Sequence, residues 1–162
     1  MPPYPLPVTS LVRWTTPPCA FSDSQHPHIT SKAHELALTV LYESGLQHLA
    51  DRPESFLAQP QEVQAFLGQL PTVWDETRYV SGYPGESAVL ARRNGDTWYV
   101  AGINGKDDPQ TLVVDLSFIK KMKSARLFAD DAAEQWQISN ITKLPTQMEC
   151  QPRGGFVLVI SK

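Results

Sequence analysis

Long apolar runs and clusters of basic residues are both scarce in this 162-residue chain, and each scarcity excludes a class of protein. No apolar run approaches the roughly 20 residues that span a bilayer, so we expect no membrane partner. The 14 Lys and Arg residues are scattered among 17 Asp and Glu, which gives a net charge of -3 and no basic patch for nucleic acid. The N-terminus lacks the basic and apolar regions of a signal peptide, which predicts a cytoplasmic product.

The chain has two cysteines and lacks common catalytic motifs, which limits the reactions that it could catalyse. Cys19 and Cys150 lie near opposite ends of the sequence, and we expect two free thiols. No Gly-x-Ser-x-Gly nucleophile elbow and no phosphate-binding glycine loop occurs. With 41% hydrophobic residues the chain can bury one ordinary core, but a (β/α)8 barrel needs about 250 residues and does not fit.

Residues 18–70 carry helical patterns. From Thr30 onward, small and apolar side chains recur at helical spacing and form one stripe, namely Ala33, Leu36, Ala37, Val40 and Leu41. Thr30 or Ser31 can cap the start of this helix, and Gly45 can end it. The stripe must be buried against the rest of the chain or against a second copy.

Two shorter helices are expected to follow. Pro53 suits the first turn of one, and Pro60 opens another that ends before Pro71. We expect these helices to form a lid or linker rather than a separate domain.

After Pro71 the hydrophobic period changes from about 3.6 to about 2 residues, which predicts strands. Turn residues such as Asn94-Gly95-Asp96 separate them. The expected strands are Thr77–Tyr83, Ser87–Arg93, Thr97–Ile103, Thr111–Phe118, Ser124–Phe128, Gln135–Ile141, Gln147–Gln151 and Phe156–Ser161. Eight short strands predict a mainly β chain with an antiparallel β-sandwich over residues 71–162, preceded by the helical segment.

Two blocks of the sequence resemble a known family. The segment FSDSQHPHITSKAHELALTVLYESGLQHLADRP is similar to the end of the catalytic barrel in glycoside hydrolase family 97 enzymes. The segments GYPGESAVLARRNGDTWYVAGINGKDDPQTLVVDLSF and PRGGFVLVI resemble the C-terminal β-sandwich of that family. The resemblance covers residues 18–162 and implies that residues 18–70 correspond to the last loop and helix of a (β/α)8 barrel. Parent enzymes of this kind are expected to be periplasmic or secreted.

Residues 1–17 form a proline-rich arm without a hydrophobic period, so they predict irregular structure. Residues 5–17 can be back-translated so that a second reading frame encodes ITRNVVGAVDYTP. That peptide is similar to the segment that precedes FSDSQ in family 97. We therefore expect that the arm is out of frame, and that Arg13 and Trp14 do not form a binding site.

The resemblance implies a structural and oligomerisation role, with no glycosidase activity of the chain itself. Glycoside hydrolysis needs two carboxyl groups that flank the scissile bond. In the family these groups, and the glutamates that hold calcium, come from regions without a counterpart here. Glu35 and Glu43 lie on roughly one helix face, but Glu43 is expected to be solvated. We expect a homo-oligomer that forms through the helix face left without its barrel.

The His and acidic residues before the first helix support an alternative, a small metal-dependent hydrolase. The candidate metal ligands are Asp23, His26, His28 and His34, and the candidate catalytic residues are His26, His28 and Glu35. Zn²⁺ or Ca²⁺ held there would lower the pKa of a bound water and suit hydrolysis of an ester or lactone, such as an acyl-homoserine lactone. The cluster lacks the His-Glu-x-x-His spacing, and the rim of the parent's sugar pocket is the competing interpretation.

A carbohydrate-binding module is a third possibility. Sugar rings would stack on aromatic side chains if these were exposed, and the candidates are Trp74, Trp98, Trp136 and Tyr99. Aromatic residues in strands more often belong to the core, so we expect these side chains to be buried.

Overall fold

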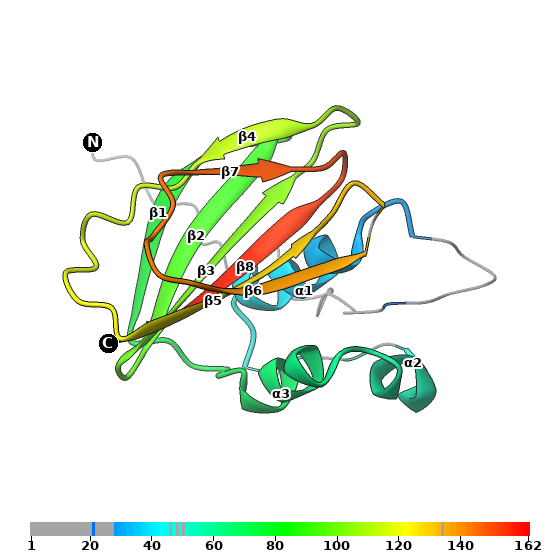
Figure 1. The fold of residues 1–162 in the computed structure, drawn as a ribbon, viewed down its shortest axis with the longest axis horizontal. Coiled ribbons are helices and arrows are strands. Elements are labelled where there is room, and N and C mark those ends of the chain that lie inside the picture. The colour runs from blue at the N-terminus through cyan, green and yellow to red at the C-terminus, as the bar shows by residue number, and fades with distance from the viewer. Residues whose placement is uncertain (1–20, 22–27, 46, 48, 50, 134) are drawn as a thin grey trace, which may run out of the picture.

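The computed structural model describes residues 21, 28–45, 47, 49, 51–133 and 135–162. Within them the chain forms a six-stranded antiparallel sheet, a two-stranded sheet and short N-terminal helices (Figure 1). The helices are α1 (Lys32–Leu41), α2 (Pro53–Leu57) and α3 (Gln61–Gln69). The strands are β1 (Glu76–Tyr83), β2 (Ser87–Asn94), β3 (Thr97–Asn104), β4 (Gln110–Val113), β5 (Ser124–Asp130), β6 (Trp136–Ile141), β7 (Gln147–Cys150) and β8 (Gly155–Ser161).

The large sheet has the order β1-β2-β3-β8-β5-β6, and β4 pairs with β7 in the small one. Figure 1 shows the small sheet in front of one face of the large sheet and α1 behind the other. The predicted mainly β fold and all eight strands are therefore confirmed. The expected fourth strand is shorter than predicted, because its ladder with β7 ends at Val113.

Each face of the large sheet carries its own core. The core between the two sheets consists of Val89, Ala91, Trp98, Val100, Leu112, Val114, Leu116, Ile119, Ala125, Ala129, Cys150, Phe156, Leu158 and Ile160. The core between the sheet and the helices consists of Phe21, Leu36, Ala37, Val40, Val63, Phe66, Ala101, Phe128 and Val157. Alternate residues of β3 and β8 supply both cores, because successive side chains of a strand point to opposite faces.

The stripe of α1 is buried on the chain's own sheet. Ala33, Leu36, Ala37 and Val40 are all 0% exposed, and a fully buried Leu or Val side chain contributes about 1.5–3 kcal/mol. The expectation that a second copy would cover this stripe is therefore wrong. The helix also ends earlier than expected, since the backbone of Tyr42 is already extended and Gly45 plays no part in the cap.

The two short helices begin as predicted, with Pro53 in the first turn of α2 and Pro60 as the N-cap residue of α3. No helix in the described part of the chain is long and apolar enough to cross a membrane. Cys150 is a buried free cysteine, and burial raises the pKa of its thiol to about 12. Cys19 and the arm at residues 1–17 lie outside the described residues.

Candidate functional site

The N-terminus of α1 is joined to the end of β5 by a buried carboxylate. Asp130 accepts a hydrogen bond from the Ser31 hydroxyl and another, of 3.0 Å, from the backbone N–H of Ala33. The Ser31 hydroxyl oxygen in turn accepts from the N–H of His34 at 3.1 Å and caps the helix. A negative charge at a helix N-terminus also interacts favourably with the helix dipole. Asp130 therefore anchors α1 to the sheet.

His34 is held against the loop before β8. Its Nδ1 lies 3.2 Å from the carbonyl oxygen of Gly154, and only a protonated Nδ1 can donate to that acceptor. Burial lowers the pKa of His34 below its ordinary value, and the charge of the neighbouring Glu35 opposes this effect in part. A Cβ atom at Gly155 would lie 2.8 Å from the Cα atom of His34, so a glycine is needed where helix and strand meet.

Glu35 is buried and bonded locally. Its Oε1 accepts a hydrogen bond from the Thr30 hydroxyl and lies 3.7 Å from Nδ1 of His28. Asp23 and His26 lie outside the described residues. Within the described ranges, no three His, Cys, Asp or Glu side chains gather in a way that could hold a metal ion.

The described members of the predicted cluster, His28, His34 and Glu35, make contacts within the fold. The structure brings His28 together with Glu35, while His34 bonds to the loop before β8 and Asp130, which sequence reasoning missed, holds the helix. Asp130 and Ser31 are 99 positions apart, so no local pattern signals their contact. The metal-dependent hydrolase stays a prediction.

Glu35 and Glu43 face different surroundings. Glu43 is solvated as expected, with 76% of its side chain exposed, and its Oε2 lies 4.0 Å from Nη1 of Arg92. Arg92 is 4% exposed and donates through Nη2 to the carbonyl oxygen of Leu41 at 2.9 Å. Its Nε and Nη1 atoms are buried without a hydrogen-bond partner among the described residues. Burial lowers the pKa of Arg92.

The aromatic residues do not form an open platform in the described part of the chain. Trp98 is buried between the sheets, as predicted. Trp74 and Trp136 are half-buried: Trp74 packs edge-on against Tyr99 at 5.3 Å between ring centroids, and Trp136 donates from its indole nitrogen to the side chain of Gln59 at 2.9 Å. The stacking surface that a carbohydrate-binding module would need is therefore not formed by these four side chains.

A groove lies between α3 and the end of the large sheet that α1 leaves uncovered. Its volume is about 570 Å³. Phe66 from α3 and Tyr99 and Val159 from the sheet supply apolar walls, and Lys123 and Arg126 supply positive charge. One helix, four strands and the loop before β5 contribute to the groove, so no local sequence pattern indicates a site here.

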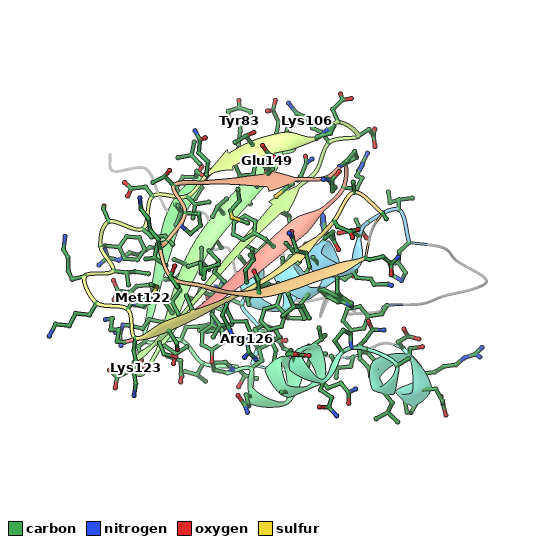
Figure 2. All side chains as sticks on the ribbon, viewed as in Figure 1. Tyr83, Lys106, Met122, Lys123, Arg126 and Glu149 are labelled. Atoms are coloured by element: carbon green, nitrogen blue, oxygen red, sulfur yellow. The ribbon has the colours of Figure 1, made fainter. Side chains whose placement is uncertain are left out.

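Exposed apolar side chains lie on β1, an edge strand of the large sheet, and on the neighbouring β4. Tyr79 and Tyr83 of β1 are 67% and 68% exposed, and Val113 of the neighbouring β4 is 52% exposed. The hydroxyl of Ser81 donates to the carbonyl oxygen of Val113 and joins the two strands. Figure 2 shows the side chain of Tyr83 projecting from the molecule beyond β4. Tyr79 pairs with Leu90 and Tyr83 with Ser87, so the two tyrosines flank the β1 edge from opposite faces of the sheet. We call Tyr79, Tyr83 and Val113 the β1 surface.

Comparisons with known proteins agree over the β-sandwich. The family described as "Glycosyl-hydrolase 97 C-terminal, oligomerisation" matches residues 73–161. A probable retaining alpha-galactosidase of Streptomyces bingchenggensis is 54% identical over 85 residues, which cover 52% of this chain and 13% of that protein. A retaining alpha-galactosidase of Bacteroides thetaiotaomicron is 36% identical over 141 residues, which cover 80% of this chain and 21% of that protein. The chain thus spans about a fifth or less of either relative.

Solved structures agree with the fold. A beta-arabinopyranosidase superimposes with a TM-score of 0.74 at 36% identity, covering 82% of this chain and 21% of that enzyme. A glycoside hydrolase family 97 enzyme of Pseudoalteromonas sp. strain K8, in complex with panose, superimposes with a TM-score of 0.72 at 24% identity, covering 82% and 22%. At 24% identity, the similarity to the family 97 enzyme supports the fold alone.

Proposed function

The chain belongs to the glycosyl-hydrolase 97 C-terminal family, an oligomerisation domain, and we propose that it self-associates through the β1 surface and has no glycosidase activity of its own. The aligned residues cover 13% and 21% of the two relatives, so we place the chain as the C-terminal part of an α-galactosidase-like enzyme. Its role there is to join subunits and to brace the helical segment.

The charge pattern of the groove supports the absence of glycosidase chemistry. Retaining and inverting glycosidases both need two carboxyl groups across the scissile bond. Among the residues that line the groove, Glu62 is the one carboxylate. Glu35 of α1 is buried and accepts a hydrogen bond from the Thr30 hydroxyl.

The two exposed tyrosines of β1 are the observation that carries the proposal. Tyrosine is enriched in protein interfaces because it buries a large area with few rotatable bonds. Among the described residues β1 pairs with β2 alone, so its outer edge offers backbone groups to a second copy. Two copies related by a twofold axis would present the same edge to each other.

The opposite edge of the sheet provides the contrast. Gln137, Ser139 and Asn140 are the exposed residues of β6, and all three are polar. Edge strands that stay free in solution generally carry polar or charged side chains. The β1 edge is therefore the better candidate for an interface.

Sedimentation velocity over a range of concentrations tests this proposal. We expect the wild-type chain to form a dimer, and a Tyr79→Ser/Tyr83→Ser variant to dissociate at concentrations at least about tenfold higher, since one interface tyrosine is often worth more than 1.4 kcal/mol. Tyr42→Ser is the matched control, because Tyr42 is 42% exposed at the end of α1 and lies off the β1 edge.

Two outcomes would contradict the proposal. A wild-type chain that stays monomeric at every concentration would remove self-association, and a dimer that survives the double variant would place the interface elsewhere. The purified chain should also release no nitrophenol from nitrophenyl α-galactoside above the rate of a buffer blank. Turnover at enzymic rates would refute the absence of glycosidase activity.

A further inference from the structure

We propose that the groove under α3 is a binding site for a small organic monoanion, a carboxylate with an apolar ring or chain. No other part of the proposed function depends on this site. The groove has a volume of about 570 Å³, within the range of about 300–1,000 Å³ that is typical of small-molecule sites.

The register of the sheet places the groove's polar and apolar groups in one row. Arg126 of β5 pairs with Asn140 of β6 on one side and with Val159 of β8 on the other, and Val159 pairs with Tyr99 of β3. Residues that face each other across antiparallel strands point to the same side of the sheet. A cation, an amide, an aliphatic side chain and an aromatic ring therefore lie side by side on the groove wall.

The apolar part of the ligand would lie between the sheet and α3. Phe66 of α3 packs against Tyr99 with ring centroids 6.3 Å apart, and against Phe128 at 5.4 Å. Burial raises the pKa of the Tyr99 hydroxyl, so this group stays protonated and can donate a hydrogen bond at neutral pH. Aromatic walls of this kind favour a ring or alkyl chain over water.

The charge of the ligand follows from the charged groups of the lining. Lys123 and Arg126 come from the sheet side and Glu62 comes from α3, so the lining carries one net positive charge in a chain whose net charge is -3. The Nε atom of Arg126 donates to Oδ1 of Asn140 at 3.2 Å, which orients the guanidinium group. Figure 2 shows Lys123 and Arg126 on the side of the molecule near α3. An arginine oriented in this way suits a carboxylate.

The serine hydroxyls complete the polar side. Ser124 of β5 pairs with Ser161 of β8, and both line the groove next to Lys123. Each hydroxyl can donate one hydrogen bond to an acceptor oxygen. The lining holds no carboxylate besides Glu62 of α3, so a cationic ligand would find a poorer complement here than an anionic one.

Calorimetric titration of the full chain tests the inference with phenylpropionate and its neutral counterpart phenylpropanol. We expect phenylpropionate to bind at least about fivefold more tightly at low ionic strength, and added salt to reduce the difference because the charges are solvent-accessible. Arg126→Gln should reduce phenylpropionate affinity at least about fivefold, while Lys121→Gln, a lysine outside the groove, should leave it unchanged.

A second variant separates loss of the site from loss of the fold. Ala65 is an exposed groove residue on α3, and Ala65→Trp should fill the space and abolish binding without touching the charges of the sheet. Equal affinity for both ligands, undiminished binding to Ala65→Trp, or no saturable binding at millimolar phenylpropionate would each overturn the inference. Dimer formation is measured separately, so either proposal can fail while the other stands.

Discussion

Replacing Asp130 should detach the first helix from the sheet. The carboxylate accepts hydrogen bonds from the Ser31 hydroxyl and from the backbone N–H of Ala33, both in a buried setting. A hydrogen bond to a charged group contributes about 1.5–3 kcal/mol, and a negative charge at a helix N-terminus adds about 0.3–1 kcal/mol. Because these contributions overlap, we expect Asp130→Ala to lower the free energy of unfolding by about 3 kcal/mol.

Urea unfolding, followed by tryptophan fluorescence and circular dichroism, measures this change. The midpoint should fall while the dependence of the unfolding free energy on urea stays constant. Asp96→Asn is the matched control, since Asp96 is exposed in the turn between β2 and β3 and its replacement should change stability by less than about 0.5 kcal/mol.

A double-mutant cycle tests the contact itself. Ser31→Ala removes the side-chain cap and should cost about 1 kcal/mol alone. If Ser31 and Asp130 act together, the double variant should lose less stability than the two single losses combined. A loss below about 1 kcal/mol in Asp130→Ala, or strict additivity in the cycle, would refute the reasoning.

Two further variants probe buried ionisable groups. Folding lowers the pKa of His34 below 6.5, so the unfolded state binds the proton more readily. The free energy of unfolding should therefore fall as the pH drops below 6.5. His34→Gln should make this fall smaller, as measured by urea titrations at a series of pH values. Arg92→Met should change stability by no more than about 1 kcal/mol. The variant loses the Nη2 hydrogen bond to the Leu41 carbonyl oxygen, but it also removes a buried charge whose Nε and Nη1 atoms have no hydrogen-bond partner in the described part of the chain. Arg92→Ala leaves a cavity and should cost about 2–5 kcal/mol, and equal losses in both variants would contradict this view.

The predictable part of the molecule is the part encoded in short patterns. The apolar runs on either side of the turn at Asn94 and Gly95 predicted β2, β3 and their connection within a residue. The stripe from Ala33 to Val40 predicted α1 and the side of it that is buried. These features depend on side-chain periods and backbone preferences that act over a few residues.

The error about the stripe has a physical cause. A helical period of apolar residues indicates that one face of the helix is buried, but it does not indicate which surface packs against that face. Here Ala101 of β3 and Val157 of β8 supply that surface, and both residues are far from α1 in the chain. The oligomeric contact assigned to this face was therefore misplaced.

The sequence by itself determined the strands, the helices and the family resemblance, since each depends on local pattern or on the order of residues. Only the tertiary structure decided what α1 covers, how Asp130 reaches Ser31, and that Arg126, Val159 and Tyr99 share one wall of a groove. Those arrangements depend on strand order and register, which bring together side chains from distant parts of the chain.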